Sequence, residues 1–160
     1  RLRVTSISGL THLEGETVSV LSEGAPVADA VVASGAITVL ETSRANVGLG
    51  YISDLQTLRY DVGAKNGTAE GKVQRITRLI IRFYQSLGGK VGQTVSDLNP
   101  LIFRAGGDDM DTATPLFDGD VETEWDADYS TDSLVYIRQD QPLPMTVEAV
   151  MPQLETQDRQ

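Results

Sequence analysis

The sequence has no cysteine and only one histidine, His12. Without cysteine, the chain can form neither a disulfide framework nor a thiolate metal site. A single histidine rules out a histidine-rich metal centre and leaves one base for a serine triad, which no Gly-x-Ser-x-Gly turn accompanies. We therefore expect no catalytic activity and no cofactor.

Long apolar runs are also missing, so the sequence predicts neither a membrane span nor a signal peptide. The chain begins with Arg1 and not with Met, from which we expect a piece of a longer protein. Its composition, 40% hydrophobic and 22% charged residues, is typical of a globular protein that buries a core.

Basic residues are absent from the segment 105–133, which carries ten carboxylates. They are Asp108, Asp109, Asp111, Asp118, Asp120, Glu122, Glu124, Asp126, Asp128 and Asp132. The other 13 acids balance the 13 bases, so the net charge of −10 resides in this segment. Such a field repels nucleic-acid phosphates, which argues against a nucleic-acid-reading module. We expect this acidic segment to be mostly loop.

The rest of the sequence predicts an all-β protein. Runs of about five apolar or alternating residues recur between turn signals, as in a small sandwich or barrel of antiparallel strands. The predicted strands are 17–21, 27–33, 36–40, 45–51, 53–61, 101–104, 134–138 and 145–151. The last two are expected to pair with each other. The pattern suggests a small β domain over 1–52, a second β region over 53–152 that contains the acidic loop 105–133, and a polar tail over 153–160.

The stretch 72–87 fits two structures. Its apolar residues recur at helical spacing, but they also alternate as in a long strand. Glycines at both ends and β-branched enrichment favour the strand. On a helix, Arg75, Arg78 and Arg82 would form one basic stripe, whereas on a regular strand they would divide between two faces. These arginines are candidate assembly contacts for the acidic segment, in this subunit or a neighbour, and the alternative is an ordinary solvated face.

Three other patterns are candidate functional sites. Asp118, Asp120 and Glu122 are the nearest candidates for a divalent cation, but the EF-hand spacing fails and we predict no metal site. Asp126 and Asp128 beside Trp125 resemble a glycosidase pair only loosely, since few aromatic residues are present to bind sugar. Gly88-Gly89-Lys90 lacks the rest of a phosphate-binding loop and is better explained as a turn.

Several stretches together resemble the tail tubular, or nozzle, proteins of short-tailed bacteriophages. They are 9–21, 35–38, 47–51, 82–92, 115–120 and 137–147. None of them carries chemistry, so the resemblance rests on their order and on their coverage of about Gly9 to Pro152. Gly50 departs from the pattern, because a proline is expected before Tyr51.

The resemblance implies a structural virion protein of the phage tail. Such proteins form a ring, expected to be a hexamer, that is part of the conduit for genome ejection and a platform for tail fibres. The implied partners are further copies of the chain, an adaptor and the tail fibres, while DNA passes without specific binding. The alternative is a carbohydrate- or receptor-binding β-sandwich module of a phage or cell-surface protein.

Overall fold

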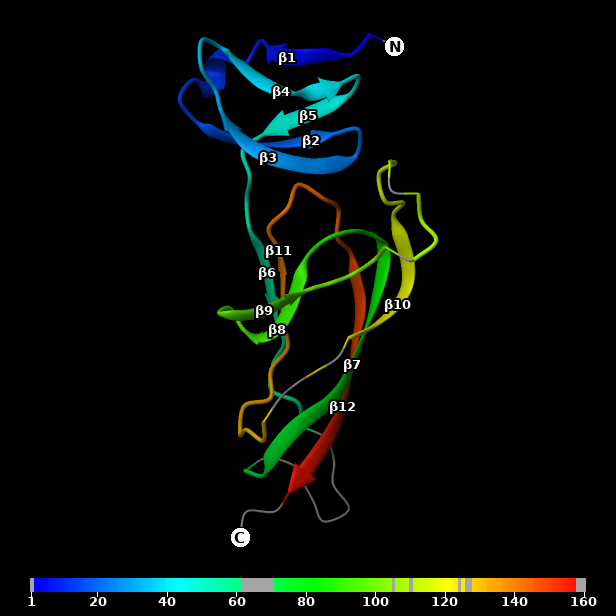
Figure 1. The fold of residues 1–160 in the computed structure, drawn as a ribbon. Helices are drawn as coiled ribbons and strands as arrows, with labels where there is room; N and C mark the ends of the chain where they lie inside the picture. The colour runs from blue at the N-terminus through cyan, green and yellow to red at the C-terminus, as the bar shows by residue number, and fades with distance from the viewer. Residues whose placement is uncertain are drawn as a thin grey trace. The chain divides into compact units, whose positions relative to one another are not determined.

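The computed structural model describes residues 2–61, 71–104, 106–109, 111–123, 125 and 128–157. They form an all-β protein in which every recorded strand pairing is antiparallel (Figure 1). The chain divides into two compact units. Unit 1 comprises Arg1–Ile52, Arg104–Pro115 and Asp140–Leu143, and unit 2 comprises Ser53–Phe103, Leu116–Gln139 and Pro144–Gln160.

Unit 1 contains two small sheets, with strand orders β1-β4 and β3-β2-β5. Its elements are β1 (Val4–Ser8), the 3-10 turn η1 (Thr11–Leu13), β2 (Thr17–Ser22), β3 (Ala25–Val31), β4 (Ala36–Thr42) and β5 (Ala45–Gly48). Alternation along β2 buries Val18 and Val20, which pack with Val32 and Ile37 in one apolar cluster. This cluster is the core of unit 1.

Unit 2 contains a three-stranded sheet, β10-β7-β12, and a four-stranded sheet, β6-β11-β8-β9 (Figure 1). Its strands are β6 (Ser53–Gln56), β7 (Val73–Ser86), β8 (Lys90–Thr94), β9 (Asp97–Pro100), β10 (Phe117–Thr123), β11 (Tyr136–Gln139) and β12 (Val147–Gln157). Leu79, Ile81 and Phe83 of β7 share one buried cluster with Val91 of β8 and Ile137 of β11. Because both sheets contribute to this cluster, unit 2 is a β-sandwich.

The stretch 72–87 forms the strand β7 and not a helix, which confirms the prediction. A tight glycine turn follows it. Gly88 and Gly89 both have positive φ, +70° and +88°. A Cβ on Gly89 would lie 2.0 Å from Cε of Met145 and 3.1 Å from the carbonyl oxygen of Arg138. This turn therefore requires glycine for both conformation and space, which accounts for the Gly-Gly pair without a phosphate ligand.

Three predictions about strands were wrong. Residues 101–104 are not a strand: Leu101 donates a backbone hydrogen bond to Gly89, but no ladder follows. The strand expected over 53–61 ends at Gln56. The final strand, β12, pairs with β7 and not with β11, because the proline-containing connection 140–146 carries the chain from one sheet to the other.

The acidic segment and the C-terminal tail also differ from expectation. The predicted loop 105–133 contains β10. The strand was not predicted because its outward-facing residues are acidic, as is typical of a loop. The expected tail 153–160 is strand as far as Gln157, where β12 still pairs with Val73 of β7. Residues 158–160 lie outside the described part of the chain.

Candidate functional site

The three candidate arginines lie on one face of β7, although a regular strand would divide them. Opposite β12, Gln153 pairs with Arg78 and the next residue, Leu154, pairs with Ile76, so Thr77 is an additional residue on β7. This β-bulge shifts the alternation by one position. Arg75, Arg78 and Arg82 are consequently all exposed, while the core side chains remain on the opposite face.

β10 places its carboxylates beside these arginines. Along β10, Asp118, Asp120 and Glu122 are exposed and alternate with less exposed residues, of which Phe117 and Val121 pack against the core of unit 2. The strand pairs with β7 alone, with Asp120 directly opposite Arg82. The exposed side chains of the two strands form a surface that we call the charged face, made of Arg75, Arg78, Arg82, Asp118, Asp120 and Glu122.

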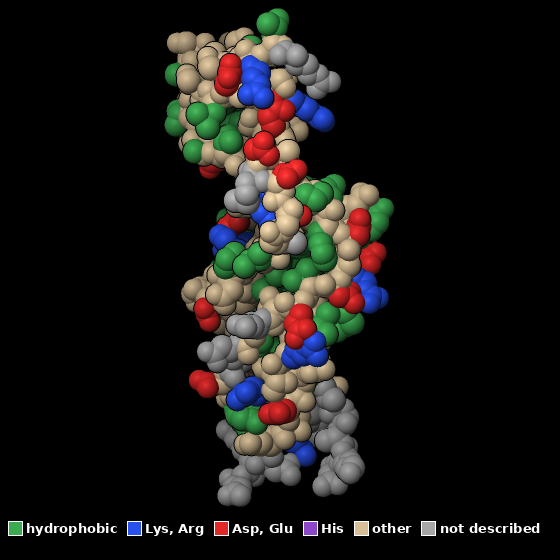
Figure 2. All heavy atoms as spheres, turned by 45° about the vertical axis from the view of Figure 1, so that its right-hand side comes forward, with side chains coloured by type: hydrophobic (Ala, Val, Ile, Leu, Met, Phe, Trp, Pro, Cys, Tyr) green, Lys and Arg blue, Asp and Glu red, His purple; other side chains and the backbone are tan. Residues whose placement is uncertain are grey.

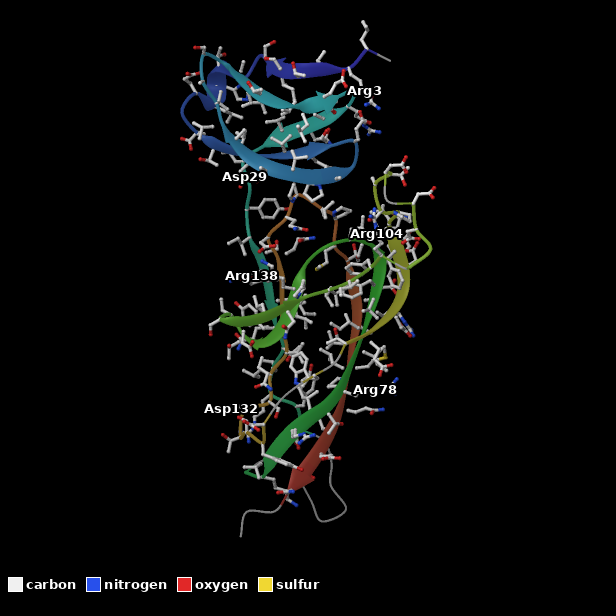
Figure 3. The ribbon with its side chains drawn as sticks, in the orientation of Figure 1. Arg3, Asp29, Arg78, Arg104, Asp132 and Arg138 are labelled. Carbon is white, nitrogen blue, oxygen red and sulfur yellow. The ribbon has the colours of Figure 1, made fainter. Side chains whose placement is uncertain are left out.

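Each of these carboxylates contacts β7. Asp120 binds Arg82 at two points, with Nε–Oδ1 at 2.7 Å and Nη2–Oδ2 at 2.9 Å. Glu122 accepts a hydrogen bond from Arg78, which projects from β7 (Figure 3). Asp118 accepts one from the backbone N–H of Gln85 at 2.7 Å. The acidic and basic side chains thus neutralise one another locally, and on unit 2 red and blue side chains adjoin (Figure 2).

The ion pairs shift the titration of their members. Hydrogen bonds from Arg82 and Arg78 lower the pKa of Asp120 and of Glu122 below their ordinary values, and the same bonds raise the pKa of the two arginines. Both carboxylates are therefore charged at neutral pH. Because the side chains are about half exposed, water and salt screen these pairs, and each stabilises the fold only weakly.

Arg75 has a different partner, which the sequence did not indicate. Its guanidinium lies 5.8 Å from the ring centroid of Tyr129, at the distance of a cation–π contact. The Tyr129 hydroxyl in turn donates to Glu155 of β12 and accepts from the side chain of Gln157, both at 3.2 Å. No short-range pattern could predict this cluster, because its members come from three separate parts of the chain.

The metal candidates do not form a cation site. Within the described ranges, no three acidic, histidine or cysteine side chains are grouped as metal ligands. Asp118, Asp120 and Glu122 follow one another along one face of a strand, and each already accepts a hydrogen bond from β7. A cation would have to displace these contacts, so the residues fit a metal poorly.

The remaining candidates are dispersed. His12 is exposed in η1. Trp125 packs against the core of unit 2 and so offers no free sugar platform, while Asp128 is exposed and Asp126 lies outside the described residues. No helix in the described part of the chain is long and apolar enough to cross a membrane.

Similarity to known proteins assigns no family. Neither the models of known protein families nor the curated proteins include a match to this chain. What the chain does must therefore be argued from its own residues. The charged face holds Asp120 and Glu122 in ion pairs, which makes these two carboxylates weak bases and weak metal ligands.

Proposed function

We propose that this chain is part of a structural virion protein of a short-tailed phage tail, acting by assembly in a nozzle ring. The ring, expected to be a hexamer, would form part of the DNA-ejection conduit and hold an adaptor and tail fibres. The observation that carries the proposal is the ordered resemblance to nozzle proteins, whose segments fall in both units. For example, the segment 82–92 covers the end of β7, the glycine turn and the first three residues of β8.

The charge distribution supports the same proposal. Arg78, Arg82 and Arg138 are each paired with a carboxylate of the same chain. Since the chain also has ten more acids than bases, the acids left over dominate its long-range field. A conduit of this composition would repel DNA phosphates during passage.

The rival function is a carbohydrate- or receptor-binding module, which the sandwich of unit 2 would also suit. Electron microscopy of the longest native chain that contains this segment, purified without ligand, separates the two. Closed rings of fixed subunit number support the nozzle. A monomer whose melting temperature rises with added glycans, but not with a matched uncharged polymer, contradicts the nozzle and supports the binding module.

A further inference from the structure

The two edges of the three-stranded sheet in unit 2 are attached to β7 by different chemistry. β12 is the longer edge, with partners from Val73 to Phe83 of β7. Its side-chain bonds to β7 are neutral: the Ser86 hydroxyl bonds both the N–H and the carbonyl oxygen of Thr146, just before β12, and the Thr77 hydroxyl donates to the carbonyl oxygen of Gln153. None of these bonds depends on a charge, so carboxylate protonation does not break them.

β10 is the shorter edge, and its side-chain bonds all depend on carboxylates. Asp118, Asp120 and Glu122 are the side chains of β10 that bond β7. The ladder is also interrupted near Phe117, where the register shifts opposite Gln85, a non-glycine residue with a φ of +42°. β10 therefore has a shorter ladder than β12 and polar side-chain bonds of one chemical kind, beside the packing of Phe117 and Val121.

From this asymmetry we infer that β10 is a releasable edge strand, which opens from β7 more readily when its carboxylates are neutralised while β12 stays in place. Release leaves the backbone of β7 open from Leu79 to Ser86, the positions that β10 covers. An open edge of this kind is able to accept another strand. The inference does not depend on the proposed function.

The surrounding charges favour release once the carboxylates are neutral. Arg78 and Arg82 of β7 remain positive, and they are then left without their partners on β10. From β12, Glu148 is the acidic side chain whose charge reaches Arg82. It offsets only part of the positive charge, so the two arginines face a strand that no longer attracts them.

The direction of the pH dependence follows from the ion pairs. The pKa of Asp120 is lowered from 3.8 and that of Glu122 from 4.5 by their arginine partners. Their contribution is fully present above the ordinary values and is lost as pH falls through the lowered values. Release is thus expected only in acid, as pH falls below the ordinary values of the two carboxyls and through their lowered values.

Hydrogen exchange of the full chain, read by mass spectrometry as protection factors, tests the inference. Between about pH 7 and about pH 3, we expect protection across β10 to fall about three- to tenfold, the range for two exposed ion pairs, with β12 unchanged. The variant Asp120→Asn/Glu122→Gln should reproduce this loss at pH 7. The control Glu148→Gln removes a carboxylate near Arg82 from β12 and should leave β10 protected.

Two results would overturn the inference. Unchanged protection of β10, in acid and in the double variant, would mean that the carboxylates do not retain the strand. Equal loss in β10 and β12 would mean that the whole sheet loosens and that no selective release exists. The acid experiment uses the unaltered chain, so the inference stays testable even if the double variant does not fold.

Discussion

Asp54 of β6 and Arg138 of β11 face each other in a two-point ion pair, with Nε–Oδ1 at 2.7 Å and Nη2–Oδ2 at 2.8 Å. The two residues are also directly paired in the ladder, although 84 positions separate them in the sequence. β6 is a four-residue edge strand whose residues are all exposed. The pair is therefore the main side-chain attachment of β6 to its sheet.

Replacing this carboxylate should loosen β6 in a pH-dependent way. The Arg138 hydrogen bond lowers the pKa of Asp54 from 3.8, so its contribution is present at neutral pH and is lost in acid. We expect Asp54→Asn to lower the melting temperature by about 2–5 °C at neutral pH and to have less effect as pH falls through the lowered pKa of Asp54. The control is Asp97→Asn on β9, the opposite edge of the sheet. Equal effects of the two variants would contradict the role of the pair.

A Cβ at Gly92 should be strongly destabilising. It would lie 1.8 Å from the carbonyl oxygen of Asp97, a backbone atom that cannot move without disrupting the β8–β9 pairing. We expect Gly92→Ala to cost about 3 kcal/mol or more in free energy of unfolding, measured by urea denaturation. The matched control is Gly48→Ala in β5, where a Cβ would meet nothing within 4 Å. A neutral result for Gly92→Ala would show that β9 does not hold this close position.

Phe83 and Tyr84 are adjacent on β7, and truncation of Phe83 should destabilise the protein much more than truncation of Tyr84. Phe83 is 1% exposed and packs edge-on against Phe103, with 5.3 Å between the ring centroids, whereas Tyr84 is 50% exposed. Phe83→Ala is expected to cost about 3–5 kcal/mol and Tyr84→Ala less than about 1 kcal/mol, both measured by urea denaturation. The reverse order would mean that β7 presents its other face to the core.

In unit 1, the Glu14 carboxylate supports the turn before β4. It accepts backbone hydrogen bonds from Ser34 at 2.7 Å and Gly35 at 2.6 Å, one on each oxygen. An amide offers a single acceptor oxygen, so Glu14→Gln should cost about 1 kcal/mol, measured by thermal unfolding. Glu16→Gln, two residues away and also exposed, is the control. A comparable loss in the control would attribute the effect to net charge instead of the turn.

The sequence predicts the class of the fold better than its pairings. Alternation and turn residues indicated an all-β chain, and the strand over 72–87 is confirmed. β10 was missed because its exposed residues are acidic, a composition that disfavours strands, although Phe117, Gly119, Val121 and Thr123 alternate with them. That alternation was the available signal. The pairing of β12 with β7 joins distant segments and has no local signature.

The charged face was predicted only in part. The sequence suggested that the arginines contact the acidic segment, and the structure brings Arg78 and Arg82 to it within one chain. The faces of the arginines were predicted wrongly for a strand, because the bulge at Thr77 arises from the register with β12 and not from the local sequence. The contact of Arg75 with Tyr129 was missed for a similar reason, since it depends on where the chain returns.

The additional residue at Thr77 marks a position where β7 can change in sequence or in length without turning its core residues outward. Substitution keeps the count, and the exposed hydroxyl would lose only a 3.3 Å bond to Gln153. Deletion would remove the bulge and restore regular alternation, with Ile76 still facing the core and Arg75 still facing solvent. Related sequences should therefore tolerate the loss of one residue between Ile76 and Leu79, with a straighter β7 and an unchanged core.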